Sequence, residues 1–353
     1  MLLTKPVFMK LKLSVLDQTP IRRGSNAKEA LQESIQLVKV TEDLGYTRYW
    51  ISEHHNFASL ATAAPEVLLA RLGADTKRIR LGSGGIMLPN HSALKVAENF
   101  RLLEALYPGR IDLGIGRAPG GDRLTASQLN PSNTFDPKDY VSQIIALKAY
   151  LTDDTSPGTV HEKVKAIPRI DTMPALWMLT SSGESAYLAA NFGMALSFAA
   201  FINPIGGAEA IEAYRKMFQP SAQLAKPQAS VGIFVFCGDT DEKVDRMQIV
   251  LDYRLFNILG SKLDESPSYE SAKDFTYSDD EWRHVLFNRQ RMIVGTPDVV
   301  KEKIEKLASN YGVDEIVVAT FAETAEDRIR SYELLTEIVE VDKEVSVNPM
   351  IGV

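Results

Sequence analysis

The stretch LGSGGIMLPNHSALKVAENFRLLEALYPGRIDLGIG, residues 81–116, has the pattern of a strand, a helix and a second strand in that order. Its beginning belongs to a strand-like run (Ile79–Ile86), and its end contains a second short apolar run (Arg110–Ile115). Between them, apolar residues recur at helical spacing over His91–Ala105, and a Pro-Gly pair ends this helix. Two strands joined through a helix are expected to run parallel, so this unit predicts an α/β fold.

The same alternation runs along most of the chain. We expect eight strands, at Leu11–Leu16, Arg48–Ser52, Ile79–Ile86, Arg110–Ile115, Ala175–Leu179, Met194–Phe198, Val231–Phe236 and Glu315–Thr320. Helical spacing separates or follows them, over Ala27–Leu44, a pattern ending at about Asp75, His91–Ala105 and about 137–151, 182–192, 205–218, 241–256, 297–310 and 325–339. Eight strand–helix units favour closure into a (β/α)8 TIM barrel over an open sheet.

Two polar segments interrupt this alternation, at about 152–174 and 257–290. Neither has the composition of a domain linker, so we expect one domain over residues 1–353. Loops this long are usually functional or mobile. For 257–290 two interpretations stay open, a disordered surface insertion and a mobile cover over the barrel mouth. In the second, Phe275, Tyr277 and Trp282 would pack on a ligand.

Composition narrows the class of protein. The 353 residues carry a formal net charge of −7, which argues against a nucleic-acid or anionic-membrane surface, since either partner requires a basic field. The single cysteine, Cys237, excludes an intramolecular disulfide and a cysteine-based metal cluster. No apolar run approaches the roughly 18 residues that span a bilayer. We therefore expect a soluble, cytoplasmic protein.

The second strand leads into the sequence WISEHHNF, residues 50–57, which contains two adjacent histidines. In a barrel of this kind the active site lies where the strands end. Neighbouring strand residues point to opposite faces, so His54 and His55 are poorly placed to share a metal ion, and no other histidine cluster completes a ligand set. We expect no metal. Besides a purely structural pair, this leaves one imidazole acting as a base or hydrogen-bond donor at the barrel mouth.

Other strand ends carry two further candidate features. Gly84-Gly85 form a floor without side chains, as expected where a ligand approaches the backbone. The sequence SSGES, residues 181–185, has two interpretations. Ser181 with Glu184 fits a helix capping box, whereas the same hydroxyls and backbone N–H groups fit an anion site, for which Arg117 would supply positive charge. The residues alone do not decide between these two interpretations.

Three ordered segments give the chain a family resemblance. They are WISEHHN (50–56), the run from LGSGGIM to GRAPGG (81–121) and AANFG (189–193). On these the chain resembles the bacterial-luciferase-like flavin monooxygenases, from the first strand to about residue 340, and is most similar to their single-subunit members. The resemblance implies a (β/α)8 barrel that uses externally reduced FMN and O2 to oxidise a small organic substrate through a flavin hydroperoxide. It further implies a separate flavin reductase as partner and a homodimer.

The resemblance also assigns roles to residues. His54 matches the family's catalytic histidine, and Gly84-Gly85 match a non-prolyl cis peptide beneath the flavin ring. The flavin phosphate falls between Arg117 and a serine segment that contains Ser181, Ser182 and Ser185. Only the resemblance chooses His54 over His55, which is expected to support its neighbour.

The chain departs from luciferase itself at two of these positions. Gly116 stands where luciferase carries a reactive thiol, which argues against a long-chain aldehyde substrate and light emission, and Ser181 replaces an acidic residue of the phosphate segment. On the same fold, a deazaflavin (F420)-dependent reductase is the main alternative, and a non-catalytic flavin-binding protein is another. A sugar-phosphate isomerase would require paired carboxylates or a lysine at the strand ends, and none is evident.

Overall fold

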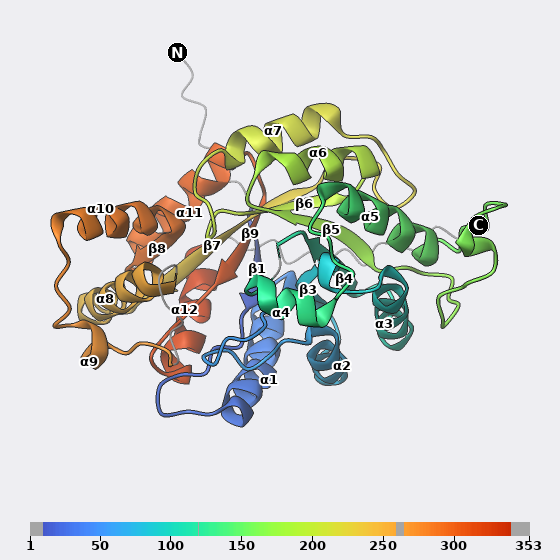
Figure 1. Ribbon diagram of the computed structural model, residues 1–353. Coiled ribbons are helices and arrows are strands. Elements are labelled where there is room, and N and C mark those ends of the chain that lie inside the picture. Colours follow the sequence, from blue (N-terminus) through green and yellow to red (C-terminus); the bar gives the residue numbers. More distant parts are fainter. Residues whose placement is uncertain (1–9, 119, 259–264, 340–353) are drawn as a thin grey trace, which may run out of the picture.

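The computed structural model describes residues 10–118, 120–258 and 265–339 (Figure 1). Nine parallel strands form its sheet, namely β1 (Lys12–Asp17), β2 (Arg48–Ile51), β3 (Arg80–Met87), β4 (Ile111–Gly116), β5 (Ala175–Thr180), β6 (Ala195–Ala199), β7 (Ala229–Cys237), β8 (Met292–Gly295) and β9 (Glu315–Ala319). Strands β1 to β7 pair in sequence order, and β9 pairs with both β7 and β1, which closes the ring. The expected (β/α)8 barrel is therefore confirmed.

Side-chain alternation explains why these short apolar runs close into a barrel. On β2, Tyr49 and Ile51 pack in the core between strands and helices, whereas Trp50 belongs to a second apolar cluster with residues of other strands. On β5, Met178 and Trp177 divide in the same way. Both sides of each strand are thus covered, as a parallel sheet requires.

The sequence interpretation missed β8. This strand pairs only with the carboxyl-terminal half of β7, at Phe234–Cys237, and lies outside the closed ring of eight. Its four residues follow a polar segment and the 3₁₀ turn at Arg289–Arg291. A run of four residues carries too little periodicity to be distinguished from a loop, which explains the omission.

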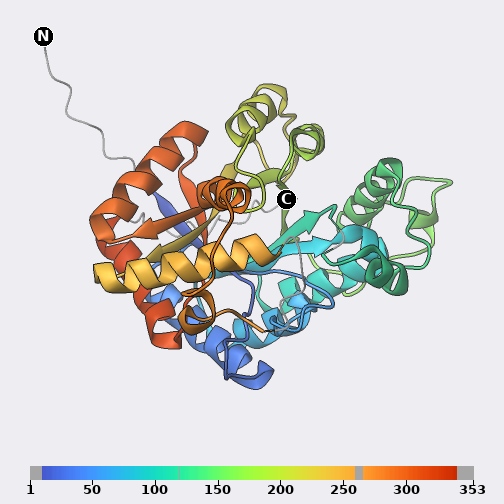
Figure 2. The ribbon, with the colours of Figure 1, turned by 60° about the vertical axis from the view of Figure 1, so that its left-hand side comes forward.

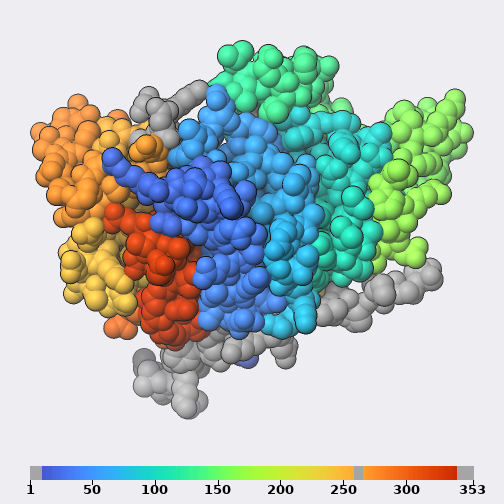
Figure 3. All heavy atoms as spheres, turned by 90° about the horizontal axis from the view of Figure 1, so that it is seen from below, coloured from blue at the N-terminus to red at the C-terminus, as the bar shows by residue number. Residues whose placement is uncertain are grey.

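Helices surround the barrel: α1 (Ala27–Leu44), α2 (Pro65–Asp75), α3 (Ala93–Leu106), α4 (Arg123–Leu129), α5 (Pro137–Leu151), α6 (Gly183–Phe192), α7 (Gly207–Met217), α8 (Asp241–Ile258), α9 (Tyr269–Ala272), α10 (Asp279–Asn288), α11 (Pro297–Tyr311) and α12 (Ala325–Ile338). From below, α12, α1, α2 and α3 form adjacent bands of the surface, coloured red, blue, light blue and teal (Figure 3). The expected helices are present, and α4, α9 and α10 were not predicted.

The two interrupting segments differ in the structure. Residues 152–174 remain largely irregular, with one 3₁₀ turn at Val160–Glu162. The described part of 257–290 instead contains α9 and α10, which lie against α8, the long yellow-orange helix of Figure 2.

The aromatic residues of this second segment are engaged within it and with α8. Phe275 packs edge-on to Tyr253 of α8 at 5.1 Å between ring centroids, and Tyr277 packs on Phe256 at 5.3 Å. Trp282 lies against Tyr277 and beneath the Arg289 guanidinium. The expectation that these rings cover a ligand is therefore corrected, because they stabilise a helical subassembly. Residues 259–264 of this expected mobile cover lie outside the described residues.

A buried ionic network spans the barrel interior. Arg48 of β2 donates to Asp112 of β4 at 2.7 Å and to Glu315 of β9 at 2.5 Å. Asp112 also accepts hydrogen bonds from the Arg80 guanidinium at 2.6 Å and from the indole N–H of Trp50 at 3.0 Å. Burial alone would raise the pKa of Asp112, but the two guanidinium groups hold that pKa below its usual range. Both carboxylates are therefore fully compensated inside the barrel.

This network generates a stability prediction. Within the described part of the chain, replacing Arg48 by Met leaves Glu315 buried with the Ser14 hydroxyl as its one side-chain hydrogen-bond donor. Removing one partner of a buried ion pair costs about 3–5 kcal/mol, and we expect that loss in the free energy of unfolding measured in urea. The control is Arg283→Met, since Arg283 pairs with Asp280 on the exposed surface and should contribute under about 1 kcal/mol. Equal losses in both variants would contradict the prediction.

Candidate active site at the carboxyl ends of the strands

A cavity of about 600 Å³, here called the main cavity, lies at the carboxyl ends of β3 to β6. Its walls contain six of the residues singled out in the sequence, Gly84, Gly85, Arg117, Ser181, Ser182 and Ser185. Leu16, Trp50 and Leu179 line its apolar side. The fold thus brings together groups that are distant in the chain, such as Leu16, Gly84 and Ser185.

The floor of the main cavity is the Gly84–Gly85 peptide, which is cis as expected. The pairing of β3 with β4 shifts register at this point, between Gly84 and Ile86. A Cβ atom on Gly85 would lie 2.7 Å from the carbonyl oxygen of Gly114, and one on Gly84 would lie 2.6 Å from a methyl group of Leu16. Side chains are therefore excluded by close packing, which leaves bare backbone facing the cavity.

At one end of the main cavity, β5 turns into α6. The Thr180 hydroxyl shapes this turn, since it donates to the carbonyl of Ser182 at 2.6 Å and accepts from the Ser182 N–H at 3.0 Å. Asn203 donates to the carbonyl of Ser181 at 3.0 Å. Among the described residues, the hydroxyls of Ser181, Ser182 and Ser185 have no hydrogen-bond partner. Three free hydroxyls next to a helix start form an environment suited to an oxyanion.

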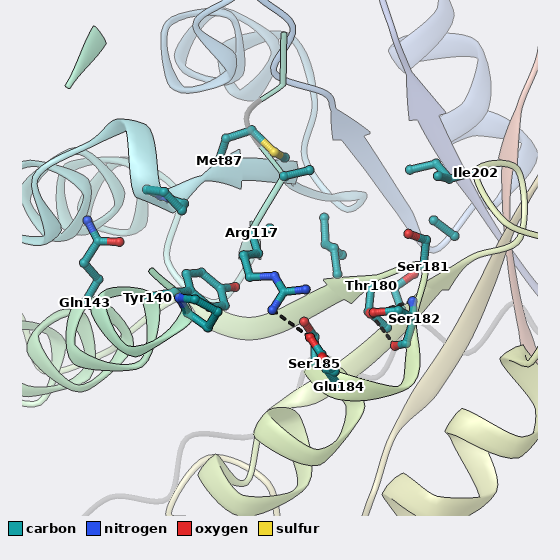
Figure 4. Close-up of a pocket in the computed structure, with 18 of the residues that line it drawn as sticks. Met87, Arg117, Tyr140, Gln143, Thr180, Ser181, Ser182, Glu184, Ser185 and Ile202 are labelled. Carbon is teal, nitrogen blue, oxygen red and sulfur yellow. Dashed lines mark hydrogen bonds and ion pairs between the residues drawn. The ribbon is translucent and has the colours of Figure 1, made fainter. Parts of the chain in front are cut away.

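The capping-box interpretation of SSGES is wrong. The helix begins at Gly183 with Ser182 as its N-cap, and no side chain caps it. Because the helix starts at Gly183, Ser181 is not the N-cap that this interpretation required. Glu184 instead reaches across the cavity to Arg117, with 2.8 Å between Nη1 and Oε2 (Figure 4). The guanidinium is thus aimed at the start of α6, where a bound anion would compete with Glu184.

Two residues that the sequence did not single out also line this end. Tyr140 and Gln143 of α5 also line the main cavity, and Tyr140 lies beside Arg117 (Figure 4). The Tyr140 hydroxyl lies 3.2 Å from the sulfur of Met178, and burial raises its pKa, so it stays protonated. Both residues sit within an ordinary amphipathic helix, where the sequence carries no signal for a ligand-facing position.

His54 is not among the residues that line the main cavity. Its Nδ1 lies 3.0 Å from the Ser52 hydroxyl, and its ring packs edge-on against Phe57. Desolvation of the ring, with smaller contributions from His55 and Arg254, outweighs the opposing effect of the Glu53 carboxylate and lowers the pKa of His54 to about 4. The imidazole is therefore neutral at neutral pH, and its Nε2 has no partner among the described residues. A neutral ring of this kind can accept a proton.

The neighbouring His55 belongs to a separate network. Glu53 is buried, and one of its oxygens, Oε1, lies 2.7 Å from His55 Nε2 and 2.8 Å from His91 Nε2. The other oxygen accepts the Met87 N–H at 3.0 Å. The expectation that no histidine cluster could complete a metal-ligand set is wrong. Glu53, His55 and His91 each offer one potential ligand atom, and these atoms lie within 4.8 Å of one another. In the structure these atoms hydrogen-bond to each other.

This network generates a prediction about pH. Burial acts to raise the pKa of Glu53, but the two histidines and the Met87 N–H outweigh it and lower that pKa from 4.5 to about 2. A carboxyl whose pKa is lower in the folded state stabilises the fold when the pH is above its pKa in the unfolded state. This stabilisation is lost as the pH falls through the pKa of the folded state. The difference between these two pKa values corresponds to about 3 kcal/mol in the free energy of unfolding.

We therefore compare Glu53→Gln with the parent in urea unfolding at pH 6 and pH 3. The parent should be more stable at pH 6, and most of its advantage should disappear as the pH falls from about 4.5 toward 2. Glu184→Gln serves as the control, because Glu184 is exposed, and it should follow the parent profile. A stability gap between Glu53→Gln and the parent that stays constant with pH would contradict the assignment.

Among the helices of residues 10–118, 120–258 and 265–339, none has the length and apolar character required to cross a lipid bilayer.

Solved structures of low sequence identity share the fold. The oxygenating constituent of 3,6-diketocamphane monooxygenase from Pseudomonas putida, in complex with FMN, has a TM-score of 0.67 at 18% identity and covers 94% of this chain and 98% of that one. An F420-dependent secondary alcohol dehydrogenase in complex with an F420-acetone adduct has a TM-score of 0.68 at 14% identity, with coverage of 95% and 100%.

Nearer relatives extend over almost the whole chain. The uncharacterised protein YwcH of Bacillus subtilis (strain 168) is 48% identical over 328 residues, covering 93% of this chain and 98% of that protein. N-acetyl-S-alkylcysteine monooxygenase of the same organism is 35% identical over 342 residues, with coverage of 93% and 98%. The crystal structure of apo-MsnO8 has a TM-score of 0.85 at 36% identity, with coverage of 94% and 99%. A model of the luciferase-like monooxygenase family matches residues 9–315, and the chain belongs to this family.

Proposed function

We propose that the protein is an FMN-dependent monooxygenase that uses externally reduced FMN and O2 to oxidise a small organic substrate. The observation that carries this proposal is the main cavity, which has a bare glycine floor and, at one end, the Arg117 guanidinium beside the serine hydroxyls at the start of α6. A planar ring that carries a phosphate on a flexible chain fits such a site. Reduced FMN, when bound, supplies the electrons that activate O2.

The residues present fit this cofactor at both ends. The phosphate would lie between Arg117 and the Ser181–Ser185 segment, where free hydroxyls, backbone N–H groups and the helix dipole all favour an anion. The flavin ring would rest on the Gly84–Gly85 floor, where a Cβ atom is excluded. The apolar wall of Leu16, Trp50 and Leu179 would keep water away from the reacting edge of the ring.

His54 is proposed to act at the reactive edge of the ring, beyond the residues that line the main cavity. Its low pKa keeps the imidazole neutral, so Nε2 can accept a proton or a hydrogen bond during oxygen transfer. Ser52 orients the ring through Nδ1. His55 is bound to Glu53, which supports a role in holding the loop rather than in the chemistry.

The comparisons support an FMN- and O2-dependent reaction as the first candidate function and F420-dependent reduction as the second. A relative named as an N-acetyl-S-alkylcysteine monooxygenase is 35% identical, which favours oxygenation over hydride transfer. An F420-dependent reductase on the same fold is the second candidate, because one structural neighbour holds that cofactor. The proposal also includes a separate flavin reductase and a homodimer, both implied by the family resemblance.

The phosphate assignment predicts the effect of Arg117→Ala on FMN affinity. A hydrogen bond to a charged group contributes about 1.5–3 kcal/mol, and we expect a loss toward the lower end because the guanidinium is 37% exposed. The measurement is titration of oxidised FMN followed by flavin fluorescence. The matched variant Glu184→Gln removes the carboxylate that competes with the phosphate, so its FMN affinity should equal or exceed that of the parent. Unchanged affinity in Arg117→Ala would place the phosphate elsewhere.

The proposed reaction predicts different effects for the two adjacent histidines. Mixing the protein, reduced FMN and air-saturated buffer should give a persistent absorbance band distinct from both reduced and oxidised FMN. His54→Ala should keep FMN affinity but lose roughly 10²–10⁴-fold in the rate of substrate oxygenation, the range for a positioned acid–base group. His55→Ala should mainly lower the melting temperature. If the parent shows no such band with FMN but transfers hydride with F420, the second candidate function is correct.

A further inference from the structure

Arg254 differs from the other buried arginines of the described residues. Arg48 and Arg328 pair with carboxylates, Arg291 donates to a carbonyl and an amide oxygen, and Arg101 donates to three carbonyls. Arg254 of α8 is 5% exposed and has neither an ion-pair partner nor a hydrogen-bond acceptor among these residues, and its Nε is buried without a partner. A buried charge without a partner is costly, so this arrangement needs a reason.

Arg254 lines a second cavity of about 240 Å³, here called the side cavity. Met247, Val250 and Phe321 provide its apolar wall, and the guanidinium lies over the Phe321 ring at 3.8 Å from the centroid. Ser266 lines the same cavity, is 7% exposed, and its hydroxyl oxygen also lacks a partner. Two buried hydrogen-bonding groups without partners thus face one small, largely apolar space.

The other charged groups of the side cavity are already engaged. Arg22 pairs with Glu33, and Arg23 lies 3.9 Å from Glu265. The one acid that lines it, Glu323, accepts the Tyr269 N–H at 2.7 Å and lies 3.5 Å from Arg246. Burial lowers the pKa of Arg254 to about 10, so it stays charged at neutral pH. The uncompensated charge of this cavity is therefore positive.

A chain of packed aromatic rings connects the side cavity with the main cavity. Phe321, on which Arg254 lies, packs against Phe234 at 5.4 Å between ring centroids, and Phe234 packs against Phe201 at 5.2 Å. Phe201 in turn lines the main cavity. The charge of Arg254 also acts on His54, whose pKa it lowers. An anion held at Arg254 would thus be linked to the main cavity through the packed rings of Phe321, Phe234 and Phe201, and it would act on the charge state of the proposed acid–base residue.

We propose that Arg254 binds the carboxylate of the organic substrate, with the Ser266 hydroxyl as a second donor and the apolar wall of Met247, Val250 and Phe321 around the adjacent carbon chain. A planar guanidinium matches a carboxylate in two parallel hydrogen bonds. The substrate class is therefore a small organic acid with an apolar body. This inference rests on the proposed monooxygenase function, because it treats the bound acid as the molecule to be oxidised.

The test uses hexanoate and hexanamide as probes, since they share size and shape and differ in charge. Binding to the FMN-loaded protein is measured by calorimetry for the parent, Arg254→Met, Arg254→Lys and the control Arg283→Met. We expect the parent to prefer hexanoate by roughly ten-fold or more, the range for hydrogen bonds to a charged group. Arg254→Met should lose this preference, Arg254→Lys should keep part of it, and Arg283→Met should match the parent.

Two further readouts separate binding from a packing role. Removing an unpaired buried charge should leave the melting temperature of Arg254→Met without ligand equal to or above that of the parent, whereas loss of a structural contact would lower it. Hexanoate should also raise the pKa of His54, followed by NMR, in the parent but not in Arg254→Met, because it neutralises the nearby charge.

Equal binding of hexanoate and hexanamide by the parent, or an undiminished hexanoate preference in Arg254→Met, would overturn the proposal. Neither result depends on oxygen chemistry. A parent that binds hexanoate through Arg254 but never forms a persistent oxygen-dependent absorbance band with reduced FMN would instead overturn the proposed monooxygenase function, and with it the assignment of the acid as the oxidised substrate.

Discussion

The ion pairs of Arg48 inside the barrel support the rest of the site. This one guanidinium joins β4 and β9 through Asp112 and Glu315, on two sides of the ring. It also lies over the Trp177 ring at 4.5 Å, and Trp177 packs edge-on against Trp50. Trp50 donates to Asp112 and contacts the position where a Cβ of Gly84 would stand. The Arg48 ion pairs, the two indole rings and the glycine floor are therefore in successive contact inside the barrel.

The glycine floor shows how packing and ligand access meet at one position. A Cβ on Gly114 would lie 2.2 Å from the Ser83 carbonyl oxygen, and one on Gly85 would lie 2.7 Å from the Gly114 carbonyl oxygen. A side chain at these positions would disrupt the pairing of β3 and β4 before it reached any ligand. The same absence of side chains leaves a flat backbone surface at the carboxyl ends of the strands. Close packing of the strands and an open cavity floor thus require the same residue type here.

The polar groups at the barrel mouth divide into engaged and free sets. Glu53 bonds two histidines and a backbone N–H, and Asp17 bonds Arg328, Ser34 and Tyr49, so these carboxylates hold loops and helices in place. By contrast, the hydroxyls at the start of α6, the Nε2 of His54 and the guanidinium of Arg254 lack such bonds within the described residues. The hydroxyls at the start of α6 line the main cavity and Arg254 lines the side cavity, where ligands would complete their hydrogen bonding.

The sequence by itself determined the alternation of strands and helices, because hydrophobic period and turn residues are local properties. It also indicated the glycine floor, Arg117 and the serine segment, since these follow strands whose ends must meet on one side of a parallel barrel. Only the tertiary structure decided which partners those side chains take. The Arg117–Glu184 pair, the approach of His91 to Glu53 and the isolation of Arg254 depend on residues distant in the chain. No local pattern encodes such contacts, because they arise when separate strand ends and helices are brought together by closure of the barrel.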